Sequence, residues 1–422
     1  MDSKKGLGKD FWIYRLGRSI YSFVATALMI GVSVWVLQTT DSPSQLAIVL
    51  IPMNIVSLTL LPLLGPFVDR YNKKYLMLIS EVISILPLGI IVWLFFNDSL
   101  SIVYLAILFA VFQCFRSIYN STATVILPSL VKTERLSEAT AKIQGIQAFV
   151  EIMGGVCGGI IVATVSFGHL ILLTIVALIV SLITLLFIRV KEDKVASTVE
   201  EEDNSTSSWF SEFKSGMSYL WRNKVLLSLT LYLALMAFFM GPLAITLEVM
   251  VLNDLKLEAD YIGYLLSGIA VGHLIAMSLF GKVSRHIPQP YFTAIFIALM
   301  GGCLIGMGLS SNYWVVLVLV ILLGVSNGLL AIPLNTLLVS SIDADYRGRV
   351  INLIGSFIAV LAPLSIAVVA YLLEFTSSFD VYLISGVFVL SVSPILAFMP
   401  ALKRFLKLRP EKSAKWLRWV YG

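Results

Sequence analysis

Two side chains of opposite charge, Arg116 and Glu151, lie inside long apolar stretches of the sequence. A charge in the middle of a membrane helix costs about 3 kcal/mol, so such residues are rare and usually serve a function. Arg116 lies 12 residues before Pro128 and Glu151 lies 11 residues after Thr140. At a rise of about 1.5 Å per residue, both lie ~17 Å from the same membrane face. Glu151 could exchange a proton while Arg116 favours its charged form, or the two could form a permanent ion pair.

Polar side chains accompany both charges at helical spacing. Gln113 and Asn120 lie within about one turn of Arg116, and Gln147 lies one turn before Glu151. Residues three or four apart share a helix face. We therefore expect two polar stripes, at one depth on consecutive helices, that face each other or a common water-filled cavity.

Two further ionisable residues lie in apolar stretches. Glu81 is seven residues past Lys74, and we expect it to reach the nearby membrane surface or to pair with Lys73 or Lys74. His273 is a lone histidine among Gly, Ala and Leu residues. A packed, hydrogen-bonded side chain is favoured there over a titrating one.

The composition indicates that membrane helices position these residues. Of the 422 residues, 58% are hydrophobic and 13% are charged, whereas soluble domains average about 25% charged. Apolar stretches long enough to span a bilayer cover residues 12–37, 43–67, 75–96, 101–127, 140–164, 168–190, 224–252, 260–282, 290–310, 313–338, 350–373 and 380–401. The short alternating segments of a β-barrel are absent from the sequence. The predicted fold class is an all-α polytopic membrane protein with twelve transmembrane helices.

The basic residues are distributed unevenly between the two sides of this membrane. With twelve spans, 28 of the 30 Lys and Arg residues fall on one side, Arg116 lies within the fourth span, and only Lys256 lies opposite. Because basic loops stay in the cytoplasm, we expect both termini in the cytoplasm. We expect the membrane to be the plasma membrane of a bacterium.

A polar linker divides the spans six and six. The predicted parts are an N-terminal six-helix bundle (1–190), a cytoplasmic linker with an interfacial helix (191–223), a C-terminal six-helix bundle (224–401) and a basic amphipathic tail (402–422). The basic loop that begins at Gly65 has a counterpart at Gly281, 216 residues later. This offset predicts two related halves.

The loop from Gly65 resembles the signature of the major facilitator superfamily. The residues at the family's spacing are Gly65, Asp69, Arg70, Lys73 and Lys74, with Asn72 where a glycine is usual. The resemblance covers the whole chain and implies two six-helix bundles around a central cavity, with this loop as a conformational latch. An aspartate in such a loop can accept a hydrogen bond from Arg70 or face the N-terminus of a neighbouring helix.

The fifth span carries a glycine pattern that resembles the antiporter motif of drug exporters in this superfamily. Its members are Gly145, Gly154, Gly155, Gly158 and Gly159, and Gly155 stands where the motif has a proline. The resemblance implies export rather than import. The same small residues also predict a close approach to a neighbouring helix.

The resemblance also implies that spans 1, 4, 7 and 10 line the substrate cavity. Arg116 matches the superfamily's span-4 arginine, although Tyr119 and Asn120 replace the last two residues of that motif. The candidate contacts mix aromatic, methionine and polar side chains, which suits an amphiphilic organic ligand. They are Arg18, Ser22, Thr26, Gln113, Arg116, Asn120, Tyr232, Met236, Met240, Asn327 and Asn335, and Gln147 of the fifth span is a further candidate.

Segments 115–131 and 213–226, together with the overall length, resemble the bacterial macrolide and siderophore exporter branch. They predict a proton-coupled secondary exporter of an amphiphilic small molecule, a monomer in the lipid bilayer that needs no cofactor, metal or nucleic acid. Arg18 and Arg116 would suit a carboxylate-bearing siderophore, and Glu151 would suit the amine of a macrolide. A lipid or glycolipid translocator is the alternative, and a solute importer is a further one. The sequence has no P-loop or HExxH pattern, and its GxSxG match at 324–328 lies inside an apolar span rather than at a strand-to-helix turn, so neither an ATP-driven pump nor an intramembrane enzyme is predicted.

Overall fold

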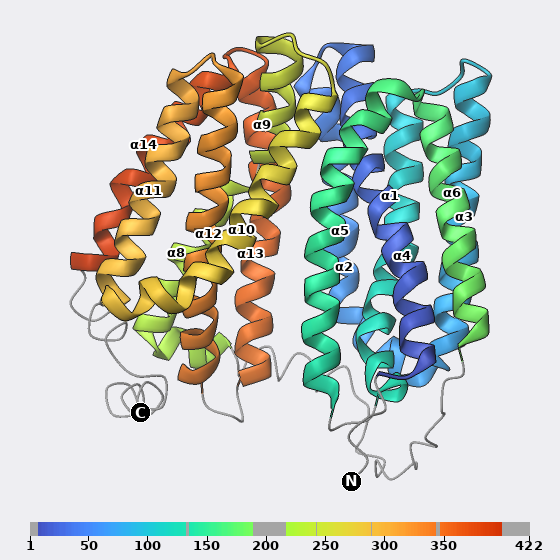
Figure 1. Cartoon of the computed structure of the whole chain (residues 1–422), viewed down its shortest axis with the longest axis horizontal. Helices are drawn as coiled ribbons and strands as arrows, with labels where there is room; N and C mark the ends of the chain where they lie inside the picture. The colour runs from blue at the N-terminus through green and yellow to red at the C-terminus, as the bar shows by residue number, and fades with distance from the viewer. Residues whose placement is uncertain are drawn as a thin grey trace. The chain divides into compact units, whose positions relative to one another are not determined.

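The described part of the chain folds into long α-helices (Figure 1). The computed structural model describes residues 7–131, 135–188, 217–241, 243–287, 289–342 and 347–398, and these contain no β-strand. The helices are α1 (Lys9–Thr40), α2 (Pro43–Arg70), α3 (Lys73–Phe96), α4 (Ile102–Leu130), α5 (Leu136–Thr164), α6 (Phe167–Phe187), α8 (Lys224–Met240), α9 (Leu243–Val249), α10 (Asp260–His286), α11 (Gln289–Leu309), α12 (Tyr313–Ser341), α13 (Arg347–Leu373) and α14 (Ser378–Phe398).

Eleven segments of the described chain are long and apolar enough to cross a membrane. The seventh runs from Lys224 to Asp254 through α8, α9 and a π-helical turn, Met250–Asp254. The last helix, α14, adds a shorter apolar stretch, Ser378–Pro394. The twelve predicted spans therefore correspond in order to the helices, which confirms the all-α polytopic fold class. The predicted tail, most of the predicted linker and its proposed interfacial helix up to residue 216 lie outside the described residues.

Polar residues at the helix starts explain where the chain turns. Ser42, Asn72, Ser101, Asn223 and Asn312 each accept a hydrogen bond from a backbone N–H two or three residues later. Each such bond satisfies a donor that has no partner within its own helix.

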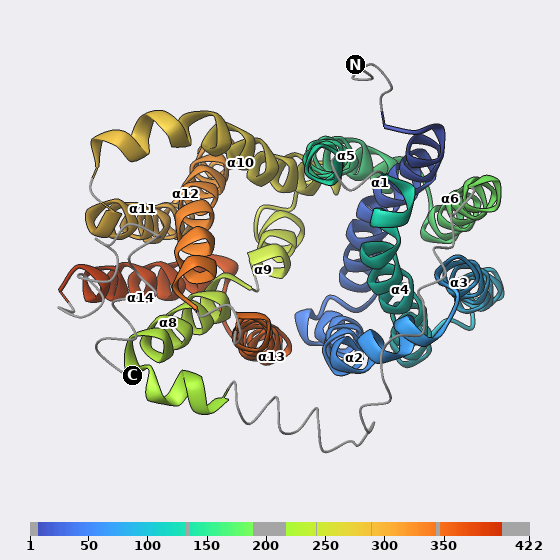
Figure 2. The ribbon, with the colours of Figure 1, turned by 90° about the horizontal axis from the view of Figure 1, so that it is seen from below.

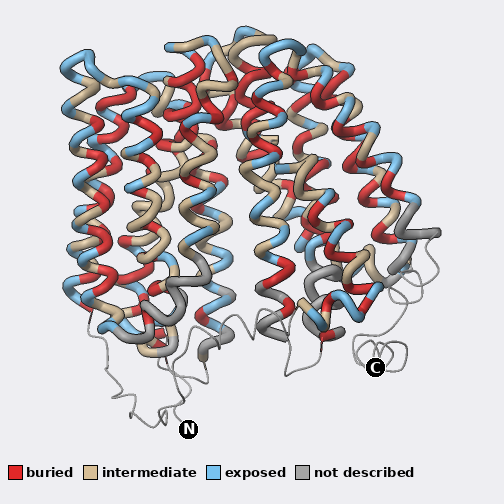
Figure 3. The backbone as a smooth tube through the Cα atoms, turned by 180° about the vertical axis from the view of Figure 1, so that it is seen from behind, coloured by how far each residue is buried: buried red, intermediate tan, exposed pale blue. Residues whose placement is uncertain are grey.

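The helices alternate buried and exposed residues along their length (Figure 3). Large apolar side chains lie on the exposed faces; Leu86, Trp93 and Phe187, for example, are 62%, 65% and 70% exposed. Such extensive apolar surface is avoided on water-soluble monomers but suits contact with lipid. The chain is a multi-pass membrane protein.

Contacts divide the chain into two units. The first comprises Met1–Thr198 and Val251–Ser267, and the second comprises Val199–Met250 and Gly268–Gly422. Within the first unit, α1 packs against α5 and α6, α4 packs against α2 and α3, and α3 packs against α6; Figure 2 shows these helices end-on. The first two turns of α10 also belong to this unit.

The second unit repeats this packing scheme. Its first span, α8 with α9, packs against α13 and α14, and α11 packs against α12 and α14. Gly272 of α10 approaches Gly324 of α12 closely. In both units, therefore, the first span packs on the fifth and sixth, the fourth on the second and third, and the third on the sixth. This equivalence supports the internal repeat that the loop offset predicts.

Candidate functional site

A buried ion pair joins α3 to α4 in the first unit. Arg116 Nη1 lies 3.9 Å from Glu81 Oε1, and the two side chains are 4% and 0% exposed. Neither Glu81 oxygen nor Arg116 Nη1 has a hydrogen-bond partner in the described part of the chain. The guanidinium instead lies over two aromatic rings, with its carbon 3.8 Å from the Tyr21 centroid and 4.5 Å from that of Tyr119. Arg116 is thus held by one distant carboxylate and two cation–π contacts.

This arrangement corrects the expectations about Glu81 and about the partner of Arg116. Glu81 neither reaches the membrane surface nor pairs with Lys73 or Lys74, so that prediction is wrong. The ion pair of Arg116 is with Glu81 rather than with Glu151. The physical reason is helix packing: α3 lies directly against α4 and α6, so a side chain on its inner face is removed from both water and lipid.

A sequence pattern could have located Glu81. Met77, Glu81, Ser84 and Leu88 recur at intervals of three or four residues and are all fully buried, so they mark the inner face of α3. Ser84 Oγ donates to the backbone carbonyl of Ser80, one turn earlier in α3, at 2.7 Å. Its small side chain is therefore a packing residue and supplies no hydrogen bond to the carboxylate.

A second polar group connects α1 to α5. Arg15 Nη2 donates to Gln147 Oε1 at 3.1 Å, and Gln147 Nε2 donates to Glu151 Oε1 at 3.0 Å. Arg15 is 2% exposed, whereas Glu151 is exposed. Arg15 was not among the predicted site residues because it lies near the start of the first apolar stretch and resembles an ordinary cytoplasmic-side charge. We call Arg15, Arg18, Glu81, Arg116 and Glu151 the intramembrane charge cluster.

Arg18 extends the group around Arg116. Its Nη2 donates to Asn120 Oδ1 at 3.2 Å, and its guanidinium carbon lies 5.6 Å from the centroid of the Tyr119 ring that also contacts Arg116. The predicted residues Arg18 and Asn120 are therefore brought together. Gln113 is directed elsewhere: its Nε2 donates to Ser57 Oγ of α2 at 2.8 Å.

The predicted cavity residues of the second unit form a less polar set. His273 Nε2 and Asn327 Oδ1 are 3.1 Å apart, which links α10 to α12 and agrees with a hydrogen-bonded histidine. Tyr232 is buried, and its hydroxyl has no partner in the described part of the chain. Met236 is half-buried, and the Asn335 side chain lies outside the described residues.

Most of the predicted signature loop is helical, because α2 runs to Arg70 and α3 begins at Lys73. Within the first turn of α3, Lys74 has a specific structural partner. Its Nζ donates to the carbonyls of Leu186 and Ile188 at 3.0 Å and 2.7 Å, at the end of α6. Asn72 caps α3. The side chains of Asp69 and Arg70 lie outside the described residues, so the latch role of this segment stays a prediction.

Replacing Lys74 with glutamine will lower the stability of the first unit. The substitution removes a charged donor from carbonyls that lack partners at a helix C-terminus, a loss of about 2 kcal/mol. Thermal unfolding of the detergent-solubilised protein measures the effect. Lys73→Gln is the matched control, since it removes the same charge one residue away; an equal loss in both variants would contradict the capping role.

The glycines of α5 form two packing faces. Gly154 and Gly158 face α1, where a Cβ on either would lie 3.0 Å from Thr26 Cβ or Ala27 Cα. Gly155 and Gly159 face the start of α10, and a Cβ on Gly159 would lie 2.8 Å from the Asp260 carbonyl oxygen and 3.0 Å from Gly263 Cα.

A hydrogen bond reinforces the approach of α5 to α10: Ser267 Oγ donates to Ile152 O at 2.9 Å. A Cβ on Gly145, by contrast, would meet no neighbouring atom within 4 Å. Four of the five glycines therefore serve the close helix approach that their spacing predicts, and Gly145 takes no part in it.

The fold and the site together define a class of protein. Repeated halves of apolar spanning helices, with charges buried among them and no reaction centre recognisable in the sequence, are features of a membrane transporter rather than an enzyme. A family description, "Major Facilitator Superfamily", matches residues 15–366. The chain belongs to this superfamily.

Relatives of the chain agree with this assignment. Macrolide efflux protein A of Streptococcus pyogenes is 19% identical over 93% of this chain and 96% of its own length. Multidrug efflux pump Tap of Mycolicibacterium fortuitum is 19% identical over 87% of this chain and 90% of its own length. Among solved structures, a bacterial homologue of the iron transporter ferroportin, in an inward-facing state, is similar with a TM-score of 0.72 at 16% identity, over 93% of this chain and all of that one.

Proposed function

We propose that this chain exports an amphiphilic small molecule across the bacterial plasma membrane in exchange for protons, by alternating access, as a monomer with both termini in the cytoplasm. The observation that carries the proposal is the buried Glu81–Arg116 pair. A carboxylate that is fully buried without a hydrogen-bond donor is costly to keep charged. Binding and release of a proton by Glu81 therefore change the charge of this site at a low free-energy cost.

The contacts of Arg116 differ between the charged and the protonated form of Glu81. When Glu81 is charged, its attraction to Arg116 draws α3 towards α4. When Glu81 is protonated, that attraction is lost, while the rings of Tyr21 on α1 and Tyr119 on α4 still hold the guanidinium. Proton binding thereby shifts the balance of contacts among α1, α3 and α4, which is the kind of differential interaction that a conformational change requires.

The direction and the substrate class are supported by separate observations. The α5 glycines resemble the motif of exporters, and the named relatives are efflux proteins. Glu151 is exposed and is tied to Arg15 only through Gln147, so its carboxylate is open to a cationic amine of the macrolide type. Arg15 and Arg18 would serve the carboxylates of a siderophore, the second candidate substrate.

Transport by the purified chain in proteoliposomes tests this function. A radiolabelled macrolide should accumulate when an imposed pH gradient favours exchange with protons, and a protonophore should abolish the accumulation. Equal movement with and without the gradient would contradict proton coupling. Movement of a fluorescent lipid in place of the macrolide would favour the lipid translocator, and transport of an iron chelator alone would favour siderophore export.

Glu151→Gln will separate substrate recognition from coupling. We expect the apparent KM for the amine to rise about tenfold, the equivalent of one charge-assisted contact, while the pH gradient still drives accumulation. The same proteoliposome assay, run over a range of substrate concentrations, measures both quantities. If accumulation is lost at every concentration, Glu151 carries the coupling proton, which is the role that its depth in the sequence also allows.

A further inference from the structure

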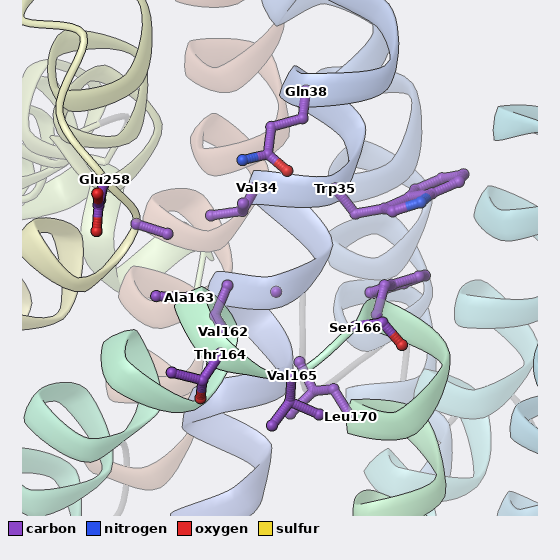
Figure 4. A pocket seen from close by; sticks show the side chains of 13 residues that line it. Val34, Trp35, Gln38, Val162, Ala163, Thr164, Val165, Ser166, Leu170 and Glu258 are labelled. Atoms are coloured by element: carbon purple, nitrogen blue, oxygen red, sulfur yellow. The ribbon is translucent and has the colours of Figure 1, made fainter.

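A pocket of about 370 Å³ lies where α1 and α5 end and α6 begins (Figure 4). Its lining includes Trp35 and Gln38 of α1, Ala163 of α5 and Glu258 of the segment before α10. Arg18, in the charge cluster, precedes Trp35 by 17 residues on the same helix, a distance of ~26 Å. The pocket is therefore a separate place in the first unit.

Two polar side chains in the lining have unused bonding capacity. Neither the Glu258 carboxylate nor the Gln38 amide is engaged in a side-chain hydrogen bond or ion pair within the described part of the chain, and both are exposed. The hydroxyls in the lining are occupied: Thr164 donates to Ile160 O at 2.8 Å, and Ser166 lies 2.6 Å from His169 Nδ1. A ligand would meet one carboxylate and one amide.

The electrostatic setting favours a cation. Glu258 is the one ionisable residue in the lining. The negative ends of the α1 and α5 dipoles point to this side, and the positive starts of α6 and α10 lie there too, so the helix dipoles give no net preference and the charged side chains decide. The connections at this end of the first unit carry the acidic residues Asp41, Asp98, Asp254, Glu258 and Asp260 against the single basic residue Lys256. This excess of negative charge attracts cations.

The remaining walls suit an apolar body. The Trp35 ring is stacked on Phe167, with centroids 5.0 Å apart and planes 13° apart, so it is held in a fixed orientation. Val34, Val162 and Ala163 add aliphatic surface. The Glu258 carboxylate and the Trp35 ring lie on opposite sides of the lining (Figure 4), so an elongated ligand would meet the carboxylate at one end and the ring at the other.

We propose that this pocket binds an amphiphilic organic ammonium ion. Glu258 neutralises the cation, Gln38 forms a hydrogen bond with the ligand, and the apolar body lies against Trp35 and Ala163. The site lies about one turn beyond Gly159, whose contact with Gly263 brings α5 and the start of α10 together. It is distinct from the intramembrane charge cluster, and its occupancy does not depend on the direction of transport.

Equilibrium binding of ethidium tests the proposal. Ethidium is a fluorescent aromatic cation with amino groups that can donate to Gln38, and its binding is followed by fluorescence anisotropy with the full chain in phosphatidylcholine nanodiscs. We expect saturable binding that weakens at least tenfold in Glu258→Gln and disappears in Ala163→Trp, which fills the pocket. Asp98→Asn removes one charge from the same end without altering the lining, and should change the affinity less than twofold.

Each contrary outcome overturns the proposal. If the original chain binds no ethidium, or if Glu258→Gln and Ala163→Trp leave every saturable component unchanged, the pocket is not a site for organic cations. If Asp98→Asn weakens binding as much as Glu258→Gln, surface charge alone explains the effect. A component lost only in Glu151→Gln belongs to the charge cluster. No gradient is applied, so the result is independent of whether the chain proves to be a proton-coupled exporter.

Discussion

Glu81→Gln is expected to abolish accumulation of substrate driven by a pH gradient, at every substrate concentration. Glutamine has the size of the protonated carboxyl group but cannot release a proton, so the variant is held in the state in which Arg116 has lost its countercharge. Downhill exchange of substrate should persist, because the exposed Glu151 and its link to Arg15 are untouched. Proteoliposomes with and without an imposed gradient distinguish the two activities.

Stability measurements separate this coupling role from a purely structural one. Removing one partner of a buried ion pair leaves an uncompensated charge and costs about 3 kcal/mol, whereas replacing both partners is often neutral. Arg116→Gln and Glu81→Gln should therefore each lower the free energy of unfolding, Glu81→Gln the less so because Tyr21 and Tyr119 still hold the arginine. The double variant should recover most of the stability and none of the gradient-driven accumulation.

The opposite result is equally informative. If the double variant accumulates substrate as the original chain does, the pair serves only to fasten α3 to α4, and the coupling proton must be carried elsewhere. Glu151→Gln, in the neighbouring polar group, is the matched control for loss of one carboxylate from the charge cluster. Its expected effect is on affinity and not on coupling.

The span pattern could be predicted from the sequence because it depends on composition alone. Twelve apolar stretches and the sorting of basic residues to one side follow from the cost of placing polar groups in lipid. The partner of Arg116 could not be predicted in the same way. Depth along each helix placed Arg116 level with Glu151, but the packing of α3 on α4 and α6 decides which acid it meets.

The same distinction holds for the other site residues. The glycine spacing in α5 indicated a packing face, yet only the fold shows two such faces, one on α1 and one on the start of α10. Arg15 carries no sequence signal that separates it from the other basic residues at the start of the first apolar stretch. Its burial beside Gln147 arises because α1 packs on α5. Long-range helix pairing is thus the part that local sequence patterns omit.

Gly159→Leu should reduce transport to background while the protein remains in the membrane. A Cβ on Gly159 would lie 2.8 Å from the Asp260 carbonyl oxygen and 3.0 Å from Gly263 Cα. These are backbone atoms, which cannot turn aside as a flexible side chain could. The larger side chain must therefore push α5 away from the start of α10, at a cost of about 1–3 kcal/mol for overpacking, and the two segments should no longer close on each other.

Two readouts make this prediction specific to the contact. The first readout uses a cysteine placed at Ala163, about one turn beyond Gly159 on α5. This cysteine should react with a membrane-impermeant maleimide faster when Gly159→Leu is also present. The labelling rate of the chain's own three cysteines is measured separately and subtracted. Gly145→Leu is the matched control, because no atom lies within 4 Å of a Cβ at that position. It adds the same side chain to the same helix and should leave both transport and labelling unchanged.

Helix α1 connects the charge cluster to the glycine contacts of α5. Tyr21 of α1 touches Arg116, and one to two turns further along the same helix Thr26 and Ala27 pack on Gly154 and Gly158. A shift of α1 caused by protonation of Glu81 would therefore be transmitted directly to α5.

If that path operates, Gly158→Leu, which separates α5 from α1, should uncouple transport from the pH gradient without faster labelling at position 163. Gly159→Leu should stop transport altogether. Identical behaviour of the two variants would show that the glycines of α5 act only as one packing surface.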